Sequence, residues 1–492
     1  MRNEYEKEDE VMKSYRLEGK YIYRDICVAI LVLITTLDFM YVWYEFVLRH
    51  NNTGHLTGIG NILMATIIYA VLYFVIGKWM HAFKIGVERK ANLLACQVLT
   101  LFTVDFIEVF LSCAITGQFR YFWYFLWIYF VSWLFMSVVN CLITVPMVNI
   151  YRKKFPPLHM IEIYGERLNK LYLKINGVKY KYNVTDLLSC DEEESVIRER
   201  IAPFDAVLLN DLPARKKNRI LKICFSMNKR VYFVPKISDI LVKNSEELNL
   251  FDTPLFLDRN HGLRLSQRAM KRFFDILLSG LALVILSPLF GITAFAIHHE
   301  DSGPVFYKQE RVTLNGKHFW ILKFRSMIVD AEKDGKPHPA GEKDDRITKV
   351  GHVIRACRID ELPQLINILK GDMSIVGPRP ERWEHCAEYR KEIPEWDLRN
   401  KVRGGLTGYA QVYGQYNTAA IDKLKMDLIY ITNYSLLLDL QIIFQTIKIL
   451  FQKESTEGFS EEQARKMHDF SAGVLDPEKL EDSADESGER GI

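Results

Sequence analysis

Two adjacent carboxylates, Asp360 and Glu361, are the residues of this sequence best suited to chemistry at phosphorus. The apolar residues of segment 362–369 recur at helical spacing, so Asp360 is expected close to the start of a helix. One interpretation is structural, with Asp360 as the helix cap and Glu361 in the first turn. The other is catalytic: an ionised aspartate beside a phosphate-binding helix start can attack phosphorus and form an acyl phosphate. Glu361 could then hold Mg²⁺ together with substrate phosphates.

Cationic side chains around the dyad favour the catalytic interpretation. They are Lys323, Arg325, Arg355 and Arg379. Phosphoryl transfer depends mainly on positioning and charge neutralisation, and arginine or lysine can contact a diphosphate. Any one of the four could be a solvated surface residue. Their grouping beside a carboxylate pair and an apolar segment favours a binding site.

The apolar segment that precedes this region, residues 273–297, is interrupted near its centre by Ser287 and Pro288. A proline removes a backbone hydrogen bond and kinks a helix. Each half has about 12 residues, or about 18 Å, against a hydrocarbon core of roughly 30 Å. A bent helix can enter and leave the bilayer on one side, whereas a kinked spanning helix would carry the following residues across. If residues 299–492 use a nucleotide-activated substrate, they must stay in the cytosol, and that condition would favour the re-entrant form.

Four longer apolar runs come first in the chain, at residues 26–48, 59–77, 91–116 and 121–150. Each is long enough to span a bilayer, which takes about 20 residues. Lysine and arginine are concentrated before the first run, between the second and third, and after the fourth. Because positive charge favours the cytoplasm, both ends of this four-helix unit are expected inside, and the chain after residue 151 begins in the cytosol.

Carboxylates inside these runs have two interpretations. They are Asp38, Glu45, Asp105 and Glu108. Intramembrane acids can mark an ion or substrate path. They can also face the interior of the bundle and form hydrogen bonds there, and Glu45 could lie at the membrane edge.

Residues 160–265 alternate short apolar strands with helical patterns, which predicts a small parallel α/β unit. Strands are expected at 160–164, 206–209 and 231–234, with a helix at 215–227. A nucleotide-binding unit would carry GxGxxG after its first strand. Gly165 has no second or third glycine after it, so a structural, oligomerising or regulatory role is favoured over nucleotide binding.

The composition excludes several other classes of protein. Apolar residues make up 49% of the 492 residues and charged residues 25%, which is unlike a disordered or collagen-like chain. The net charge of +3 gives no reason to expect nucleic-acid binding. The eight cysteines lack CxxC spacing, which favours reduced thiols over a disulfide framework. The acidic tail, residues 476–492, is expected to be disordered.

The motifs resemble one known family when they are taken in order. They are KRFFD (271–275), SP (287–288), GPVFY (303–307), KFRSM (323–327), DELPQ (360–364), GDMSIVGPRP (371–380) and GLTGYAQVYG (405–414). The set resembles the bacterial sugar transferase family, the monotopic phosphoglycosyl transferases, over residues 268–453. With four helices and an α/β insert ahead of it, the whole chain resembles the large polyprenyl glycosylphosphotransferases of the undecaprenyl-phosphate galactose or glucose phosphotransferase type.

The resemblance implies a sugar-1-phosphate transferase with a ping-pong mechanism. Asp360 would attack the β-phosphorus of a UDP-sugar, release UMP and pass the sugar phosphate to polyprenyl (undecaprenyl) phosphate. Glu361 would hold Mg²⁺, and the substrate-binding residues would be Arg355, Arg379, Lys323, Arg325, Pro378 and Pro380. Ser287 and Pro288 match the helix-breaking pair of the family, and Asp275 matches an acid at the membrane face. The product would enter exopolysaccharide, capsule or O-antigen synthesis.

Two departures from the family pattern fall on positions expected to be loops. Gly404 and Gly405 stand where the family usually has Pro-Gly, and Thr313 stands where it usually has glycine. Altered flexibility is expected there rather than lost activity.

The expected fold class is membrane α plus α/β: four transmembrane helices, a small Rossmann-like domain, and a membrane-associated α/β catalytic domain with a re-entrant helix. The expected parts are a cytosolic segment (1–24), the helix bundle (25–151), the degenerate Rossmann-like domain (152–265), the re-entrant helix (266–299), the catalytic domain (300–455) and the tail (456–492). The resemblance places the protein in the bacterial inner membrane, with its catalytic domain facing the cytosol. Downstream glycosyltransferases would be its partners, and the additional modules are compatible with a homodimer.

Two alternatives stay open on the residues alone. A nucleotide-sugar glycosyltransferase would use Asp344 and Asp345 as a metal pair and release UDP. A non-catalytic membrane scaffold would use the α/β insert to recruit partners.

Overall fold

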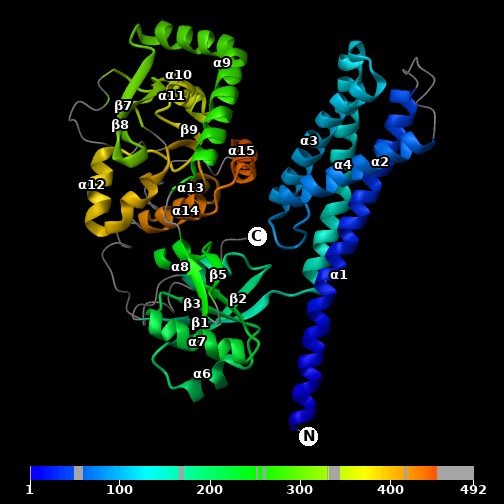
Figure 1. Ribbon diagram of the computed structural model, residues 1–492, viewed down its shortest axis with the longest axis vertical. Helices are drawn as coiled ribbons and strands as arrows, with labels where there is room; N and C mark the ends of the chain where they lie inside the picture. The colour runs from blue at the N-terminus through cyan, green and yellow to red at the C-terminus, as the bar shows by residue number, and fades with distance from the viewer. Residues whose placement is uncertain are drawn as a thin grey trace. The chain divides into compact units, whose positions relative to one another are not determined.

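The computed structural model describes residues 2–48, 59–165, 171–250, 253–258, 262–329, 331, 344–414 and 418–450 (Figure 1). For residues 2–18 the description covers the backbone alone. The chain divides into two compact units, Met1–Pro235 and Lys236–Ile492. The acidic tail lies outside the described residues. The expected domain boundaries, including the one at residue 265, stay predictions.

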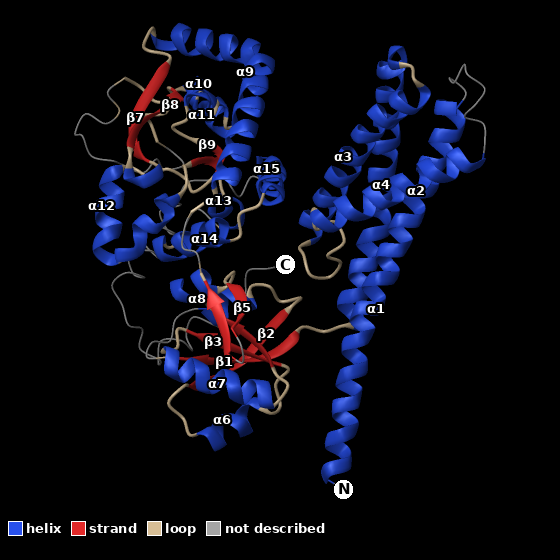
Figure 2. Ribbon diagram, viewed as in Figure 1, coloured by secondary structure: helices blue, strands red, loops and turns tan. Residues whose placement is uncertain are grey.

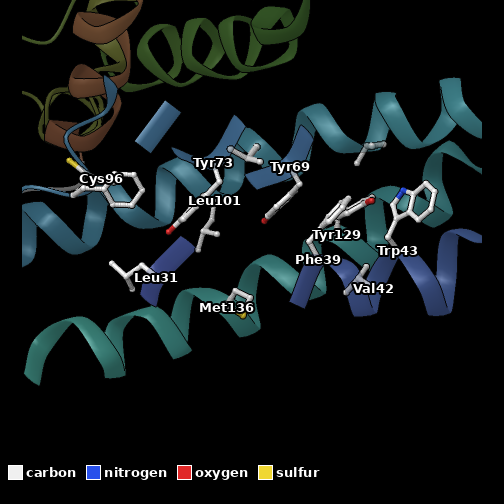
Figure 3. Packing of buried hydrophobic residues seen from close by; sticks show 14 of the residues in the cluster. Leu31, Phe39, Val42, Trp43, Tyr69, Tyr73, Cys96, Leu101, Tyr129 and Met136 are labelled. Carbon is white, nitrogen blue, oxygen red and sulfur yellow. The ribbon is translucent and has the colours of Figure 1, made fainter. Parts of the chain in front are cut away.

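The first unit begins with long apolar helices. They are α1 (Arg2–Val42), which continues as a π-helical turn (Trp43–Val47), α2 (Ile59–Trp79), α3 (Lys90–Thr116) and α4 (Phe122–Lys154). Buried aromatic and aliphatic side chains fill the interior between them, including Phe39, Trp43, Tyr69, Tyr73 and Tyr129 (Figure 3). Large apolar side chains such as Trp123 and Leu142 stay exposed on the outer faces, as contact with lipid requires.

Five helical segments among the described residues are long and apolar enough to cross a membrane. They are Gly19–Val47, Gly60–Trp79, Lys90–Thr116, Phe119–Lys154 and Leu265–Asp301. The chain is therefore a membrane protein with a helical N-terminal region, as the apolar runs predicted. Four of these segments correspond to the four expected runs, and the fifth contains the Ser287-Pro288 interruption.

A parallel sheet completes the first unit. Its strands are β1 (Leu158–Tyr164), β2 (Tyr182–Ser189), β3 (Ala206–Asn210) and β4 (Arg230–Phe233), in the order β2-β1-β3-β4. Helices α6 (Glu194–Ile201) and α7 (Ala214–Ser226) supply apolar side chains to one core, and α5 (Leu171–Asn176) supplies them to another. The predicted α/β unit is confirmed, and β2 is a strand that the pattern did not indicate.

The second unit is mostly helical, with short strands (Figure 2). In chain order its elements are α8 (Ile237–Val242), β5 (Glu246–Leu250), β6 (Thr253–Leu257), α9 (Leu265–Asp301), β7 (Phe306–Val312), β8 (His318–Phe324), α10 (Lys349–Ala356), α11 (Gln364–Lys370), β9 (Ser374–Val376), α12 (Trp383–Glu392), β10 (Gly405–Thr407), α13 (Tyr409–Tyr413), α14 (Ala420–Thr432) and α15 (Leu436–Leu450). Strands β7 and β8 pair antiparallel, and β9 and β10 pair parallel. Helix α8 packs into the core around Trp396 and Leu424, so it belongs to this unit rather than to the α/β sheet.

Helix α9 bends sharply along its length (Figure 1). It contains Pro288, which has no N–H for the carbonyl of Val284, the acceptor one helical turn earlier. The hydroxyl of Ser287 donates to that carbonyl instead, over 2.8 Å. The serine therefore compensates for the hydrogen bond that the proline removes.

Candidate active site

The carboxylate dyad lies on a short 3₁₀ turn, Ile359–Glu361, between α10 and α11. Arg358 precedes this turn and lies in the left-handed region, with φ of 58°, so α10 does not continue into the dyad. Helix α11 begins only at Gln364, with Pro363 before it and no side-chain cap. Asp360 therefore lies near a helix start, as predicted, but it does not cap that helix.

Glu361 is the centre of a partly buried ionic cluster. Its Oε1 accepts hydrogen bonds from Arg379 Nη2 at 2.6 Å and from Lys323 Nζ at 3.3 Å. Strand β8 supplies Lys323, and Arg379 comes from the loop after β9. Burial alone would raise the pKa of the Glu361 carboxyl, but the charges of Arg379 and Lys323 hold it well below its usual value. The two cations therefore favour the ionised form of Glu361.

Asp360 has the opposite electrostatic character. Burial raises the pKa of its carboxyl, and the charge of Glu361 raises it further. Lys323, Arg355 and Arg358 act against this shift. A carboxylate with a raised proton affinity is a better nucleophile once it has ionised, and the surrounding cations favour ionisation. The two neighbouring acids therefore suit different roles, Asp360 as nucleophile and Glu361 as fixed anion.

Arg355 lies on α10, close enough for its charge to lower the pKa of Asp360. The N-terminus of α10 is fixed by Glu300, whose carboxylate accepts from the backbone N–H groups of Lys349 at 2.7 Å and Val350 at 3.2 Å. The Thr348 hydroxyl caps the same helix. Helix α9 therefore positions the helix that carries Arg355.

Arg325 is predicted to bind substrate, but its guanidinium is engaged elsewhere. It forms a bidentate ion pair with Asp301 at the end of α9 and donates to the carbonyl of Pro304 at 2.7 Å. Its side chain is only 8% exposed. The geometry assigns Arg325 to fixing the end of α9 against β8, outside the cluster around Glu361.

The prolines on either side of Arg379 have packing roles. The carbonyl of Pro378 accepts from the N–H of Gly405 at 2.9 Å. A Cβ on Gly404 would lie 2.5 Å from Cγ of Pro380, so only glycine allows this close approach. Both residues shape the loop that presents Arg379.

Two positions at which this chain departs from the family pattern, Thr313 and Gly405, are held by hydrogen bonds or by strand pairing. Gly405 is the first residue of β10. The Thr313 hydroxyl donates to the carbonyl of Asp372 and accepts from the N–H of Gly404, both at 3.0 Å. The threonine links two loops beside Arg379, and the expected effect of these departures on flexibility stays a prediction.

Asp275 lies on α9 and is 3% exposed. Its Oδ1 accepts from the Ser374 hydroxyl at 3.0 Å and from the N–H of Ile375 at 2.9 Å. One turn earlier, Arg272 donates to the last carbonyls of α11, Ile368 at 2.5 Å and Leu369 at 2.7 Å. The first half of α9 is thus fixed to the helix and strand that follow the dyad.

The site also uses Arg399 and Arg358, which were not among the predicted site residues. Arg399 donates to the carbonyl of Arg379 at 3.0 Å and pairs with buried Asp427 at 2.7 Å. Arg358 sits beside the dyad in a backbone conformation that cannot be read from the sequence. A search for charged residues within two positions of the dyad would have found Arg358, but no local signal marks Arg399.

Glu361 also suits a magnesium ligand, because it stays ionised and both of its hydrogen bonds go to Oε1. Within the described part of the chain, no group of three or more His, Cys, Asp or Glu side chains is placed to hold a metal ion. Phosphate oxygens of a substrate would have to complete the coordination shell, as is common for Mg²⁺.

Comparisons with known proteins identify the family of the chain. The model of the family described as bacterial sugar transferase matches residues 266–453. The exopolysaccharide production protein ExoY of Sinorhizobium fredii is 40% identical over 191 residues, which cover 36% of this chain and 83% of that protein. The chain belongs to the bacterial sugar transferase family. The family region contains the whole ionic cluster, with Lys323, Asp360, Glu361 and Arg379.

Two further relatives match this chain over about half of their own length. The UDP-glucose:undecaprenyl-phosphate glucose-1-phosphate transferase of Klebsiella pneumoniae is 40% identical over 230 residues, or 44% of this chain and 48% of that protein. The UDP-N-acetylgalactosamine-undecaprenyl-phosphate N-acetylgalactosaminephosphotransferase of Aeromonas hydrophila is 40% identical over 256 residues, or 50% and 59%. The matched part of the chain therefore spans about half the length of each.

Proposed function

We propose that the protein transfers a hexose 1-phosphate from a UDP-sugar to polyprenyl (undecaprenyl) phosphate and releases UMP. One observation carries the proposal: adjacent carboxylates in one cationic cluster have opposite electrostatic characters, Asp360 with a raised pKa and Glu361 with a lowered one. The names of the relatives from Klebsiella pneumoniae and Aeromonas hydrophila support the class of substrate.

The proposed reaction has two displacements at one phosphorus. A carboxylate oxygen of Asp360 attacks the β-phosphorus of the donor, the bond to the bridging oxygen breaks, and UMP leaves with the electron pair. A phosphate oxygen of the polyprenyl acceptor then attacks the same phosphorus and releases the carboxylate. The product is a polyprenyl diphosphate sugar, and Asp360 returns to its starting form.

The cations of the cluster orient and neutralise the phosphates. Arg379 and Lys323 hold Glu361 in place and present positive charge beside Asp360. Arg355 adds a third cation from α10. Glu361 would hold Mg²⁺ together with donor phosphate oxygens, and the ion would supply further neutralisation of charge.

We also propose that α9 is re-entrant, so that the catalytic unit stays on the cytosolic face of the bacterial inner membrane. A straight helix of this length would extend about 55 Å, roughly twice the hydrocarbon thickness. The bend, with Ser287 and Pro288 inside the helix, supports a hairpin. So does the packing, because Arg272 in one half and Glu300 in the other both bond to the same catalytic unit.

The proposed place in metabolism is the first membrane step of exopolysaccharide, capsule or O-antigen synthesis. The name of the Sinorhizobium fredii relative supports this assignment. The product would pass to downstream glycosyltransferases, and the protein would work as a homodimer. The small α/β domain would serve a structural or regulatory role.

The test supplies UDP-sugar labelled on the β-phosphate, without a lipid acceptor. The expected result is release of UMP with label retained on Asp360, and chase of that label into lipid when polyprenyl phosphate is added. Asp360→Asn should take no label, while Asp344→Asn and Asp345→Asn should still take it. Release of UDP would support the glycosyltransferase alternative, and unchanged lipid product from Asp360→Asn would support the scaffold alternative.

A further inference from the structure

The buried face of α3 carries a line of polar side chains through the helix bundle. They are Gln97, Thr100, Asp105, Glu108, Ser112 and Thr116. Residues three, four, seven or eight positions apart lie on one side of a helix, and every member of this line has such a neighbour within it. At about 1.5 Å per residue the line extends about 28 Å, against a hydrocarbon core of roughly 30 Å. We call it the polar seam, and it runs nearly the full depth of the membrane.

Side chains from the neighbouring helices bind the seam along its length. The bonds are Thr144 Oγ1 to Gln97 Oε1 (3.0 Å), Tyr69 OH to Asp105 Oδ1 (3.0 Å), and Ser112 Oγ with Tyr129 OH (2.8 Å). The rings of Tyr69, Tyr73 and Tyr129 lie in the interior between the helices (Figure 3). The seam therefore consists of three hydrogen-bonded pairs drawn from α2, α3 and α4, with Asp105 and Glu108 one helical turn apart between the outer two pairs.

Among the described residues, no cationic side chain pairs with the acids of the seam. Asp105 is 5% exposed and Glu108 is 2% exposed. On α1, Asp38 accepts from the Ser132 hydroxyl at 2.6 Å. In the described part of the bundle no lysine or arginine is buried, and none forms an ion pair with these carboxyls. An uncompensated negative charge at this depth is costly, so these groups must hold protons or exchange them.

Two acceptor atoms at the seam are buried without a partner among the described residues. One is Oε1 of Glu108, and the other is Oδ1 of Asn140, whose amide donates to Tyr73 OH at 3.4 Å. Polar side chains commonly hold membrane helices together, which explains the paired groups. Helix association does not explain the unpaired oxygens of Glu108 and Asn140, because a buried acceptor without a hydrogen bond destabilises the fold.

We propose that the polar seam is a proton pathway, with Asp105 and Glu108 as the groups that bind and release the proton. A proton leaves one hydroxyl or carboxyl and joins the next free acceptor oxygen, with no change in oxidation state, and a pH gradient drives the net flow. The titratable groups that interact electrostatically with the two acids are Asp38 from α1, Tyr69 and Tyr73 from α2, and Tyr129 from α4. The activity is separate from the proposed sugar-phosphate transfer, which uses the second unit.

The test reconstitutes the full chain in liposomes that contain a pH-sensitive dye, with potassium and valinomycin to compensate charge. The wild type should collapse an imposed pH gradient faster than protein-free liposomes do. Asp105→Asn and Glu108→Gln should lose this extra flux. Asp25→Asn, an exposed acid on α1, is the matched control and should keep it.

A second measurement distinguishes loss of the proton pathway from misfolding of the variants. The infrared carbonyl band of a protonated carboxylic acid should be present in the wild type and reduced in Asp105→Asn and Glu108→Gln. A helical circular dichroism signal and a thermal unfolding midpoint like those of the wild type would show that the helix bundle of both variants is folded. The proposal is overturned if the wild type is no faster than protein-free liposomes, or if both variants keep the wild-type flux.

Discussion

Arg272 and Glu300 lie on the same helix, yet both bind ends of helices in the same catalytic unit. Arg272 donates to the last carbonyls of α11, and Glu300 accepts from the first N–H groups of α10. On a straight helix these residues would be separated by about 40 Å. The bend in α9 lets one membrane-associated helix position the elements on both sides of the dyad.

This relationship predicts that both ends of α9 face the cytosol. Single cysteines replacing Leu265 and Ser302, in a chain without the exposed Cys357, should react with an impermeant maleimide in inverted vesicles but not in intact cells. A cysteine replacing the exposed Phe119 should react from the opposite side, because positive charge favours the cytoplasm at the other helix ends. Labelling of position 302 in intact cells would contradict the re-entrant arrangement.

The bond from Ser287 to Val284 predicts an interaction between neighbouring substitutions. Ser287→Ala leaves the Val284 carbonyl without its donor and should cost about 1–3 kcal/mol of stability. Adding Pro288→Ala should recover part of this loss, since the new N–H can bond to the same carbonyl. Thermal unfolding in detergent measures both effects, with Ser266→Ala at an exposed position as the control. Equal losses in the single and double variants would argue against this role of the hydroxyl.

The pKa of Asp360 predicts an acidic limb in the pH dependence of kcat/KM. Burial and Glu361 raise this pKa, so the nucleophile stays protonated to a higher pH than a free aspartate, whose pKa is about 3.9. Activity should fall as the pH drops through the raised value. Arg358→Gln removes a charge that lowers the pKa and should move the limb to higher pH, whereas Arg358→Lys should keep it in place. An unmoved limb in Arg358→Gln would mean that another group titrates.

The buried ion pair between Lys271 and Asp439 predicts that loss of the lysine strongly destabilises the fold only while the aspartate is present. The two atoms are 2.6 Å apart, the side chains are 7% and 8% exposed, and Tyr430 also donates to Asp439. Lys271→Met leaves a buried carboxylate unpaired and should cost about 3–5 kcal/mol. The double variant with Asp439→Leu should regain much of this stability, as denaturation in detergent would reveal. A double variant as unstable as the single one would exclude the unpaired charge as the cause.

The two hydrogen bonds of Thr313 predict a specific effect on donor binding. Thr313→Ala frees the Gly404 N–H and the Asp372 carbonyl, so the loop beside Arg379 loses a connection. The KM for the UDP-sugar should rise more than kcat falls, because the change affects positioning rather than the nucleophile. Thr313→Ser keeps the hydroxyl and should resemble the wild type. Equal KM values in the alanine and serine variants would exclude this role.

The sequence by itself determined the apolar helices, the parallel α/β unit, the order of the family motifs and the adjacency of Asp360 and Glu361. Each of these depends on spacing along the chain, where helical or alternating periodicity and neighbouring residues suffice. The same local information placed Pro288 within a membrane helix and predicted its kink, because proline removes the hydrogen bond to the carbonyl four residues earlier.

Only the tertiary structure decided which cations meet the dyad. Lys323 and Arg379 reach Glu361, whereas Arg325, two residues after Lys323, binds Asp301 instead. In a regular strand these two positions would share a face, but β8 ends at Phe324, so the direction of Arg325 depends on which distant element packs there. Motif order cannot supply that information, because electrostatic pairing acts across space between residues that are far apart in the chain.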